Sequence, residues 1–400
     1  MLTSFQRAIH KLPWYQLAKY TLLLVAFAHI GHVVIGQVLY DTFFKAKPGH
    51  DFMAYYWGAK AFRAGINMYS HDAVAGMFGG EDLFLYNYPP LTIWIFLPLS
   101  YLTPVSAYAV YLIFKFTALF ALLRLWMKHF MPVKHWWIWL VMLCAAGFNQ
   151  AMVRDLGTGN ITVFEQFFLW TGFWAILQGR QLKAALYIGF PAIFKLAPIY
   201  FSGALMLGRS IIKGLLACLA LIGLLLGFLW LNHWVYPELF TAFTQRPNMF
   251  EYIKWINPSA LALCRDFCQT YWRDDAGLYY PMYFGLVALT LGYALYISIK
   301  LKWNKHPMEM LMLGTLVYGA ILPRFMDYQH IVMLIPSIHV MYYCFEKRWQ
   351  RCIVLLFLWL HTWPYHFWMV NVGLLVIYGQ YLIKQQRLNP NFVTRAIDTV

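Results

Sequence analysis

The chain has 400 residues, of which 61% are hydrophobic and only 12% are charged. An ordinary soluble domain, with about a quarter of its residues charged, is excluded. Apolar runs of about 18 residues or more instead predict a helical protein with about a dozen membrane spans. The formal net charge of +15 is assigned to basic loops held in the cytoplasm beside anionic lipid, and not to nucleic-acid binding.

Residues 1–400 are predicted to form a single all-α membrane domain. Hydrocarbon offers no hydrogen-bond partner to free backbone groups, so apolar runs of this length are expected to be helices. No internal repeat or low-complexity tract divides the chain. The first span is expected at about residues 17–38. A cytoplasmic N-terminus is favoured by the basic residues before this span and at its start, which are Arg7, Lys11 and Lys19.

Residues 41–90 are predicted to be the first external loop. The run from Phe52 to Ala64 indicates a short amphipathic helix, which Gly65 and Asn67 suit as a terminating turn. Aromatic side chains with a polar tip are common at the membrane interface, and those of this loop are expected there. They are Tyr55, Tyr56, Trp57 and Tyr69.

The remaining apolar runs are interpreted as further spans, with a second external loop at 232–275. The run at 90–102 is short for a full crossing, and it is either a half-span or part of one bent helix. The further runs lie at about 104–126, 135–151, 159–178, 182–206, 210–231, 277–299, 308–324, 330–346, 351–366 and 367–384.

Loop charges support most of this layout. The acidic residues gather in the two external loops, and the basic clusters after the later spans fall on the cytoplasmic side, as the positive-inside tendency requires. These clusters are Lys300, Lys302, Lys305, Lys347, Arg348, Arg351, Lys384 and Arg387. One basic group disagrees, because the order of spans places Arg124, Lys128 and Lys134 outside.

Charged residues within spans need a reason, because each costs about 2.5–3.5 kcal/mol on insertion scales. Glu165 and Lys195 lie in adjacent predicted spans at comparable depth. They either form an ion pair between neighbouring helices, or Lys195 faces a phosphate. Lys115 is interpreted as a side chain that snorkels toward the interface without a functional role.

Asp51 is the candidate for chemistry. It follows the first span, where a substrate in the outer leaflet would present its head group. A carboxylate there can take the proton of a sugar hydroxyl as that oxygen attacks an activated carbon. The alternative is a helix N-cap, because Asp before a helical run is a common cap.

The turn from Pro323 to His330 lies between two predicted spans. Arg324 could hold a phosphate through its planar fork, and His330 could bond a phosphate or sugar. The alternative is that both residues anchor helix ends at the interface.

Several stretches together resemble glycosyltransferase family 87. The most specific is D-F-x-A-Y-Y-x-x-A-x-A-x-x-x-G-x-x-x-Y, at Asp51–Tyr69, followed by Y-P-P-L at Tyr88–Leu91. Shorter matches are Gly157–Asn160, where Thr158 replaces a Gln of the family, Lys195–Pro198, Asn257–Ser259, and the turn at Pro323–His330 with Pro336. The family consists of polytopic C-type enzymes and includes mycobacterial mannosyltransferases that extend phosphatidylinositol mannosides.

The resemblance implies a reaction and a location. Family members move a sugar from a polyprenyl-phosphate sugar in the outer leaflet to a hydroxyl of a lipid-linked or periplasmic acceptor. A single displacement would invert the anomeric centre, and mannose is the sugar that the resemblance favours. The expected setting is a bacterial inner membrane, with the site facing the periplasm and with membrane lipids, donor and acceptor as the partners.

The resemblance also implies site residues. Asp51 maps onto the expected general base, and His330 maps onto a histidine of the last block. The candidate substrate-binding residues are Tyr55, Tyr56, Tyr88, Lys195, Asn257, Arg324 and His330. No cofactor is expected, because no D-x-D pair for a metal-bound nucleotide sugar is present. Carboxylates in the outer loops leave a divalent ion open.

Two other classes of function compete with an enzyme. A transporter or lipid flippase would also be polytopic and could carry Glu165 and Lys195 along a substrate path. The absence of a repeat between the two halves of the sequence argues against a transporter. A non-catalytic membrane scaffold would leave the pattern around Asp51 without a purpose.

Overall fold

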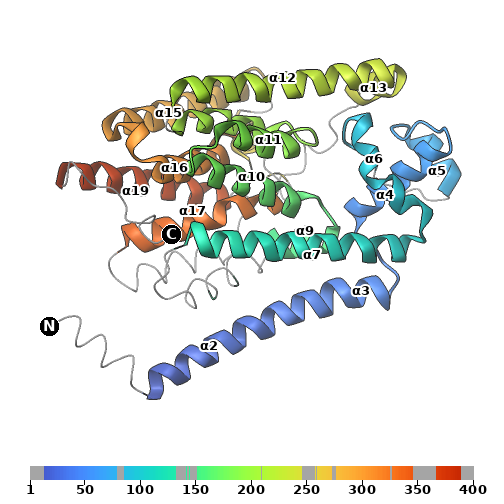
Figure 1. The fold of residues 1–400 in the computed structure, drawn as a ribbon, viewed down its shortest axis with the longest axis horizontal. Coiled ribbons are helices and arrows are strands. Elements are labelled where there is room, and N and C mark those ends of the chain that lie inside the picture. Colours follow the sequence, from blue (N-terminus) through green and yellow to red (C-terminus); the bar gives the residue numbers. More distant parts are fainter. Residues whose placement is uncertain are drawn as a thin grey trace.

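The structure is a computed structural model. It describes residues 13–78, 85–131, 141, 144, 151–208, 210–245, 257, 259–272, 276–324, 327–345 and 366–388. The described residues are helical, with no strand among them, which confirms the all-α prediction. Most of the long helices run roughly along one direction, and α4, α5, α6 and α13 gather at one end of the bundle (Figure 1).

The first span is one continuous helix with a change of pitch. It consists of α2 (Pro13–Gly31), the π-helix η1 (His32–Leu39) and α3 (Tyr40–Phe43). Its apolar side chains are largely exposed, and η1 packs against α9 (Ala151–Thr158). The span predicted at 17–38 is therefore present, and its far end leads directly into the segment that carries Asp51.

The first external loop folds into short helices at one end of the molecule. They are α4 (His50–Arg63), α5 (His71–Phe78), η2 (Pro90–Thr92), α6 (Ile93–Phe96) and η3 (Leu97–Tyr101). The predicted loop helix corresponds to α4, and Gly65 after it adopts the left-handed φ of 72°. Both α6 and η3 pack on α4. The short run at 90–102 therefore stays at the α4 end and does not cross the bundle (Figure 1).

Three of the four aromatic residues expected at the membrane interface are core residues. Tyr55 and Tyr56 of α4, and Tyr69 after it, are buried with at most 6% of their surface exposed, so the prediction is wrong for these three. Trp57 is half-buried. The hydroxyl of Tyr56 donates to the Leu102 carbonyl oxygen at 2.8 Å. The α6–η3 segment covers this face of α4 with protein, which explains why these side chains are buried.

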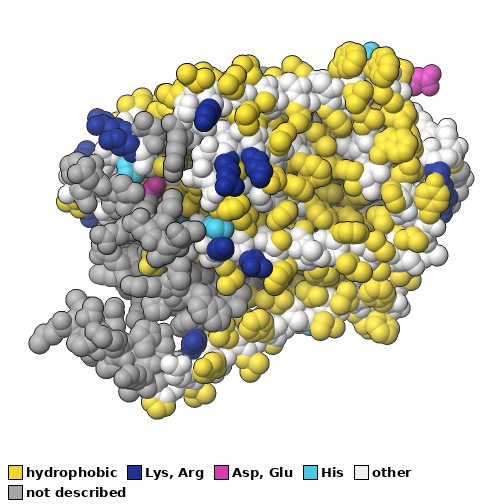
Figure 2. All heavy atoms as spheres, in the orientation of Figure 1, with side chains coloured by type: hydrophobic (Ala, Val, Ile, Leu, Met, Phe, Trp, Pro, Cys, Tyr) yellow, Lys and Arg dark blue, Asp and Glu magenta, His cyan; other side chains and the backbone are white. Residues whose placement is uncertain are grey.

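Four helices of the described residues are long and apolar enough to cross a membrane. They are the α2–α3 helix, α7 (Pro104–His129), α12 (Ile211–Val235) and α15 (Ala276–Leu301). Thr103 and Ser210 cap α7 and α12 by accepting the backbone N–H groups of Ser106 and Lys213. Hydrophobic side chains cover much of the visible face over these helices, as a lipid-facing surface requires (Figure 2).

The direction of α7 corrects the predicted position of one basic group. Because α6 and η3 do not cross, α7 starts at the α4 end and runs back toward the end where α2 begins (Figure 1). Arg124 and Lys128, near the end of α7, therefore lie at the α2 start and not at the α4 end. The predicted order of spans, which put them on the same side as the first external loop, was wrong; with the α4 end outside, they agree with the positive-inside tendency. Lys134, the third residue of this group, lies outside the described residues.

The run predicted as a span at 182–206 is not one continuous helix, because the chain breaks within it. The helix α11 (Gln181–Ala192) ends after Pro191, and the 3₁₀-helix η4 (Ala197–Leu207) starts with Pro198 in its first turn. Proline lacks the N–H that continues a helix. Lys195 lies in the break, so its side chain leaves from irregular backbone rather than from a helix face.

The remaining described helices complete the bundle. They are α10 (Thr162–Leu177), α13 (Pro237–Thr244), α14 (Ala260–Tyr271), η6 (Trp303–Lys305), α16 (Pro307–Ile321), η7 (Asp327–Met333), α17 (Leu334–Cys344) and α19 (His366–Leu388). The predicted span at 351–366 and most of the one at 135–151 lie outside the described residues. The total of about a dozen spans stays a prediction.

Candidate active site

Asp51 lies in the first turn of α4 but does not cap it. The N-cap residue is Gly49, and its position has no side-chain cap. The N-cap interpretation of Asp51 is therefore wrong. Its side chain is 22% exposed, and Oδ1 lies 3.6 Å from Nε2 of the exposed His50. A carboxylate in the first turn is favoured by the positive end of the helix dipole.

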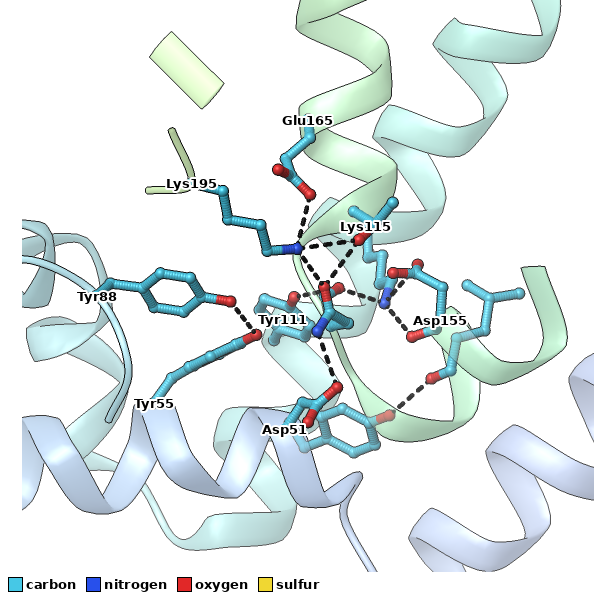
Figure 3. A network of polar contacts seen from close by, with 12 residues as sticks. Asp51, Tyr55, Tyr88, Tyr111, Lys115, Asp155, Glu165 and Lys195 are labelled. Atoms are coloured by element: carbon cyan, nitrogen blue, oxygen red, sulfur yellow. Dashed lines mark hydrogen bonds and ion pairs between the residues drawn. The ribbon is translucent and has the colours of Figure 1, made fainter. Parts of the chain in front are cut away.

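The carboxylate of Asp51 is held by Asn160, from the turn between α9 and α10. Nδ2 of Asn160 donates to Oδ2 of Asp51 at 2.8 Å. On the other side of the same amide, Oδ1 accepts from Thr162 Oγ1 at 2.8 Å and from Lys195 Nζ at 3.1 Å. Asn160 thus links the Asp51 carboxylate on α4 to the Lys195 ammonium in the break between α11 and η4 (Figure 3).

Lys195 lies between Asn160 and Glu165. Its Nζ is 2.8 Å from Oε2 of Glu165, in the first turn of α10, which confirms the predicted ion pair. It also donates to Asn160 Oδ1 and, at 3.3 Å, to Thr162 Oγ1. The Lys195 side chain is 18% exposed and that of Glu165 only 7%.

A second ion pair lies beneath the turn. Nζ of Lys115, on α7, is 2.8 Å from Oδ2 of Asp155, and neither side chain is exposed. The same ammonium donates to the carbonyl oxygens of Asp155 and Asn160. The prediction that Lys115 snorkels without a role is wrong, because it is completely buried and fixes the backbone of the Asn160 turn. Tyr111 reinforces this contact by donating to the Asn160 carbonyl at 2.9 Å.

Two glycines bring α4 against this turn. A Cβ on Gly49 would meet the carbonyl group of Thr158 and lie 2.7 Å from the Gly157 oxygen. A Cβ on Gly159, whose φ is 72°, would lie 2.7 Å from Cβ of Phe52. Only backbone without side chains can approach this closely. The contact between Asp51 and Asn160 therefore depends on both glycines.

Two tyrosines lie beside the network. The hydroxyls of Tyr55 and Tyr88 are 3.2 Å apart, and the Tyr88 ring packs edge-on against Phe194, the residue before Lys195. Burial raises the pKa of Tyr55 well above its usual value, so its hydroxyl stays protonated. Both tyrosines point toward the side of the network that holds Lys195 (Figure 3).

The remaining predicted residues lie outside the network of Figure 3. Tyr56 contacts the Leu102 carbonyl. Asn257 is buried, and its neighbour Ser259 caps α14 and donates to the Pro323 carbonyl at 2.7 Å. This contact brings two predicted segments together, since Arg324 follows Pro323.

The last predicted residue, His330, is buried in η7, which packs against α9 and α10 on either side of the Asn160 turn. Among the described residues, no three His, Cys, Asp or Glu side chains lie close enough together to hold a metal ion.

A family model of glycosyltransferase family 87 matches residues 86–323, which is more than half of the chain. The chain belongs to glycosyltransferase family 87. A comparison with curated proteins finds none that matches. This family 87 protein is therefore a glycosyltransferase, and the transporter and scaffold interpretations are set aside.

The matched region contains only part of the candidate site of this glycosyltransferase. Tyr88, Asn160, Lys195 and Asn257 lie inside residues 86–323, and Asp51 lies before them. The hydrogen bond between Asp51 and Asn160 therefore joins the matched region to the segment that precedes it.

Sequence reasoning missed part of this glycosyltransferase site. Asp155 and Thr162 were given no role, and Asn160 was noted only as the end of a motif. Asp155 could have been noticed as a carboxylate close to Gly157 and Gly159 of that motif, where one helix ends and the next begins. No pattern in the sequence paired it with Lys115, 40 residues earlier.

Proposed function

We propose that this enzyme moves a hexose, mannose by family resemblance, from a polyprenyl-phosphate sugar to a hydroxyl of a lipid-linked or periplasmic glycan acceptor. Asp51 acts as the general base, and the anomeric centre is inverted. The observation that carries the proposal is the partly exposed Asp51 carboxylate, held by Asn160 close to the Lys195 ammonium.

In the proposed step, Asp51 takes the proton of the acceptor hydroxyl. The acceptor oxygen forms a bond to the anomeric carbon as the bond from that carbon to the phosphate oxygen breaks, with the electron pair leaving on the phosphate. The transition state is oxocarbenium-like, as in glycoside hydrolysis. Oδ2 of Asp51 is occupied by Asn160, so Oδ1, which faces His50, is the oxygen that receives the proton.

Cationic side chains would stabilise the departing phosphate. Lys195 is partly exposed, and its contact to Thr162, at 3.3 Å, is longer than those to Asn160 and Glu165, so a phosphate oxygen could replace this contact while the Glu165 pair stays intact. Arg324, at the start of the turn beside Ser259, is the second candidate. A fixed positive charge acts most strongly where the negative charge develops.

The Tyr55 and Tyr88 hydroxyls are proposed to bond the sugar. Their rings are buried, so both hydroxyls are held in place, 3.2 Å from each other and beside the network that contains Asp51 and Lys195. Tyr69 supports this arrangement by donating to the Tyr88 carbonyl at 2.6 Å.

The charge distribution supports a periplasmic site in a bacterial inner membrane. Asp41, Asp72 and Glu238 belong to α3, α5 and α13, which gather at the α4 end (Figure 1). Lys and Arg side chains lie mainly toward the other end of the visible face (Figure 2). Basic residues remain in the cytoplasm, which favours placing the α4 end outside.

A transfer assay tests the proposal. The purified enzyme in lipid vesicles would receive radiolabelled polyprenyl-phosphate mannose and candidate lipid acceptors. Asp51→Asn removes the base, so we expect the loss of at least 100-fold in transfer that is typical of general base removal. Asp72→Asn is the matched control, since its side chain is fully exposed on α5 and should leave transfer unchanged. Full activity of Asp51→Asn would rule out Asp51 as the base.

A further inference from the structure

The amide of Asn160 has a fixed orientation. An ammonium group only donates hydrogen bonds, so the Asn160 atom 3.1 Å from Lys195 must be the oxygen. The Thr162 hydroxyl donates to the same oxygen at 2.8 Å. With Oδ1 held by two donors, Nδ2 has to face Asp51, where it can only donate.

The backbone of Asn160 is fixed as firmly as its side chain. Its carbonyl accepts from Lys115 at 2.6 Å and from Tyr111 at 2.9 Å. The residue is 3% exposed, so water does not compete for these contacts. The amide can therefore neither rotate nor move away when the charge on Asp51 changes.

We propose that Asn160 positions the general base Asp51, and that the hydrogen bonds from Lys195 and Thr162 determine which way the Asn160 amide faces. Asn160 holds Oδ2 of Asp51 and so leaves Oδ1 to take the proton of the acceptor. Its amide also separates the Asp51 carboxylate from the Lys195 ammonium, which keeps the two charges from closing into a direct ion pair. This inference rests on the proposed role of Asp51.

The isosteric variant Asn160→Asp tests the proposal. A carboxylate can still accept from Lys195 and Thr162, but it has no donor for Asp51 and would face it with like charge. We expect kcat to fall about 10- to 100-fold, the range of a lost hydrogen bond to a charged group, with the KM for polyprenyl-phosphate mannose changed less than threefold. Thr162→Val, which removes one of the two donors to Oδ1, should lower kcat by about two- to tenfold.

The double variant Asp51→Asn with Asn160→Asp exchanges donor and acceptor and keeps the contact. Its thermal unfolding in detergent should return toward the wild-type midpoint from that of Asn160→Asp alone, while transfer stays absent. Because Asp51→Asn itself removes the base, the double variant tests the contact and not catalysis. A midpoint that stays as low as that of Asn160→Asp alone would show that the hydrogen bond between residues 51 and 160 is not what Asn160→Asp loses.

The outcomes separate this inference from the proposed function. If Asp51→Asn abolishes transfer but Asn160→Asp retains the wild-type kcat, the positioning role is wrong and the base assignment stands. If Asp51→Asn retains full transfer, the base assignment itself is wrong. If Asn160→Asp raises only KM, Asn160 binds substrate and does not position the base.

Discussion

At the scale of single residues, the site depends on polar groups that are buried only because they are paired. Lys115 and Asp155 have no exposed side-chain surface, and Lys115 also donates to the backbone carbonyls of Asp155 and Asn160. An unpaired charge in this position would be far more costly than an exposed one. The pair therefore contributes to stability and to the position of Asn160 together.

Breaking this pair should be costly for stability. Lys115→Met leaves Asp155 buried without its cation, so we expect the free energy of unfolding to fall by about 3–5 kcal/mol. Thermal unfolding in detergent would measure the change, and Lys128→Met on the exposed end of the same helix is the control. Adding Asp155→Leu should recover part of the loss, because an apolar pair avoids the unpaired charge. An unchanged midpoint for Lys115→Met would contradict the buried pair.

At the scale of elements, the proposed active site is a contact between the start of α4 and the turn from α9 to α10. Gly49 and Gly159 let the two backbones approach, and α4 in turn is covered by α6 and η3. These short elements resist prediction, because hydrophobic periodicity marks long helices far better than tight turns. The run at 90–102 shows this, since its hydropathy alone did not indicate that it packs on α4 instead of crossing.

Adding a methyl group at this contact should separate the elements. In Gly49→Ala the new Cβ meets the carbonyl groups of Thr158 and Gly157, so α4 and Asp51 must move. A shift of about 1 Å costs on the order of 100-fold in rate. We therefore expect transfer to fall by at least tenfold, measured in the vesicle assay.

Gly157→Ala is the matched control for this experiment. Gly157 lies near the end of α9, just before the turn, and a Cβ there would have no atom within 4 Å. Transfer should stay within about twofold of wild type, since surface substitutions away from such contacts have small effects. Equal losses in the Gly157 and Gly49 variants would show that the close approach of α4 is not what matters.

At the scale of the whole molecule, the sequence predicted an all-α membrane protein, the first span, the loop helix with Asp51 and the Glu165–Lys195 pair. These follow from hydropathy and from the cost of charge in a bilayer, which depend on local sequence. The direction of α7 and the burial of Tyr55 could not be predicted in this way. Both depend on how α6 and η3 pack on α4, which is a tertiary contact.

The orientation of the enzyme can be tested with single cysteines. Asp72→Cys lies at the α4 end, and Lys128→Cys lies at the opposite end of α7. A membrane-impermeant maleimide should label the first in intact cells and the second only after the membrane is opened. The unmodified enzyme gives the background from its own cysteines. Labelling of both positions in intact cells would contradict the direction assigned to α7.

The long sequence separation between Asp51 and Asn160 also bears on biosynthesis. The two residues are 109 positions apart, so Asp51 leaves the ribosome well before the residue that holds it. Chains fold from the N-terminus as they are made, so α4 is synthesised before α7 and α9, and its contact with Asn160 forms only after both have emerged. A nascent chain stopped before residue 160 would carry the proposed base without the side chain that holds it.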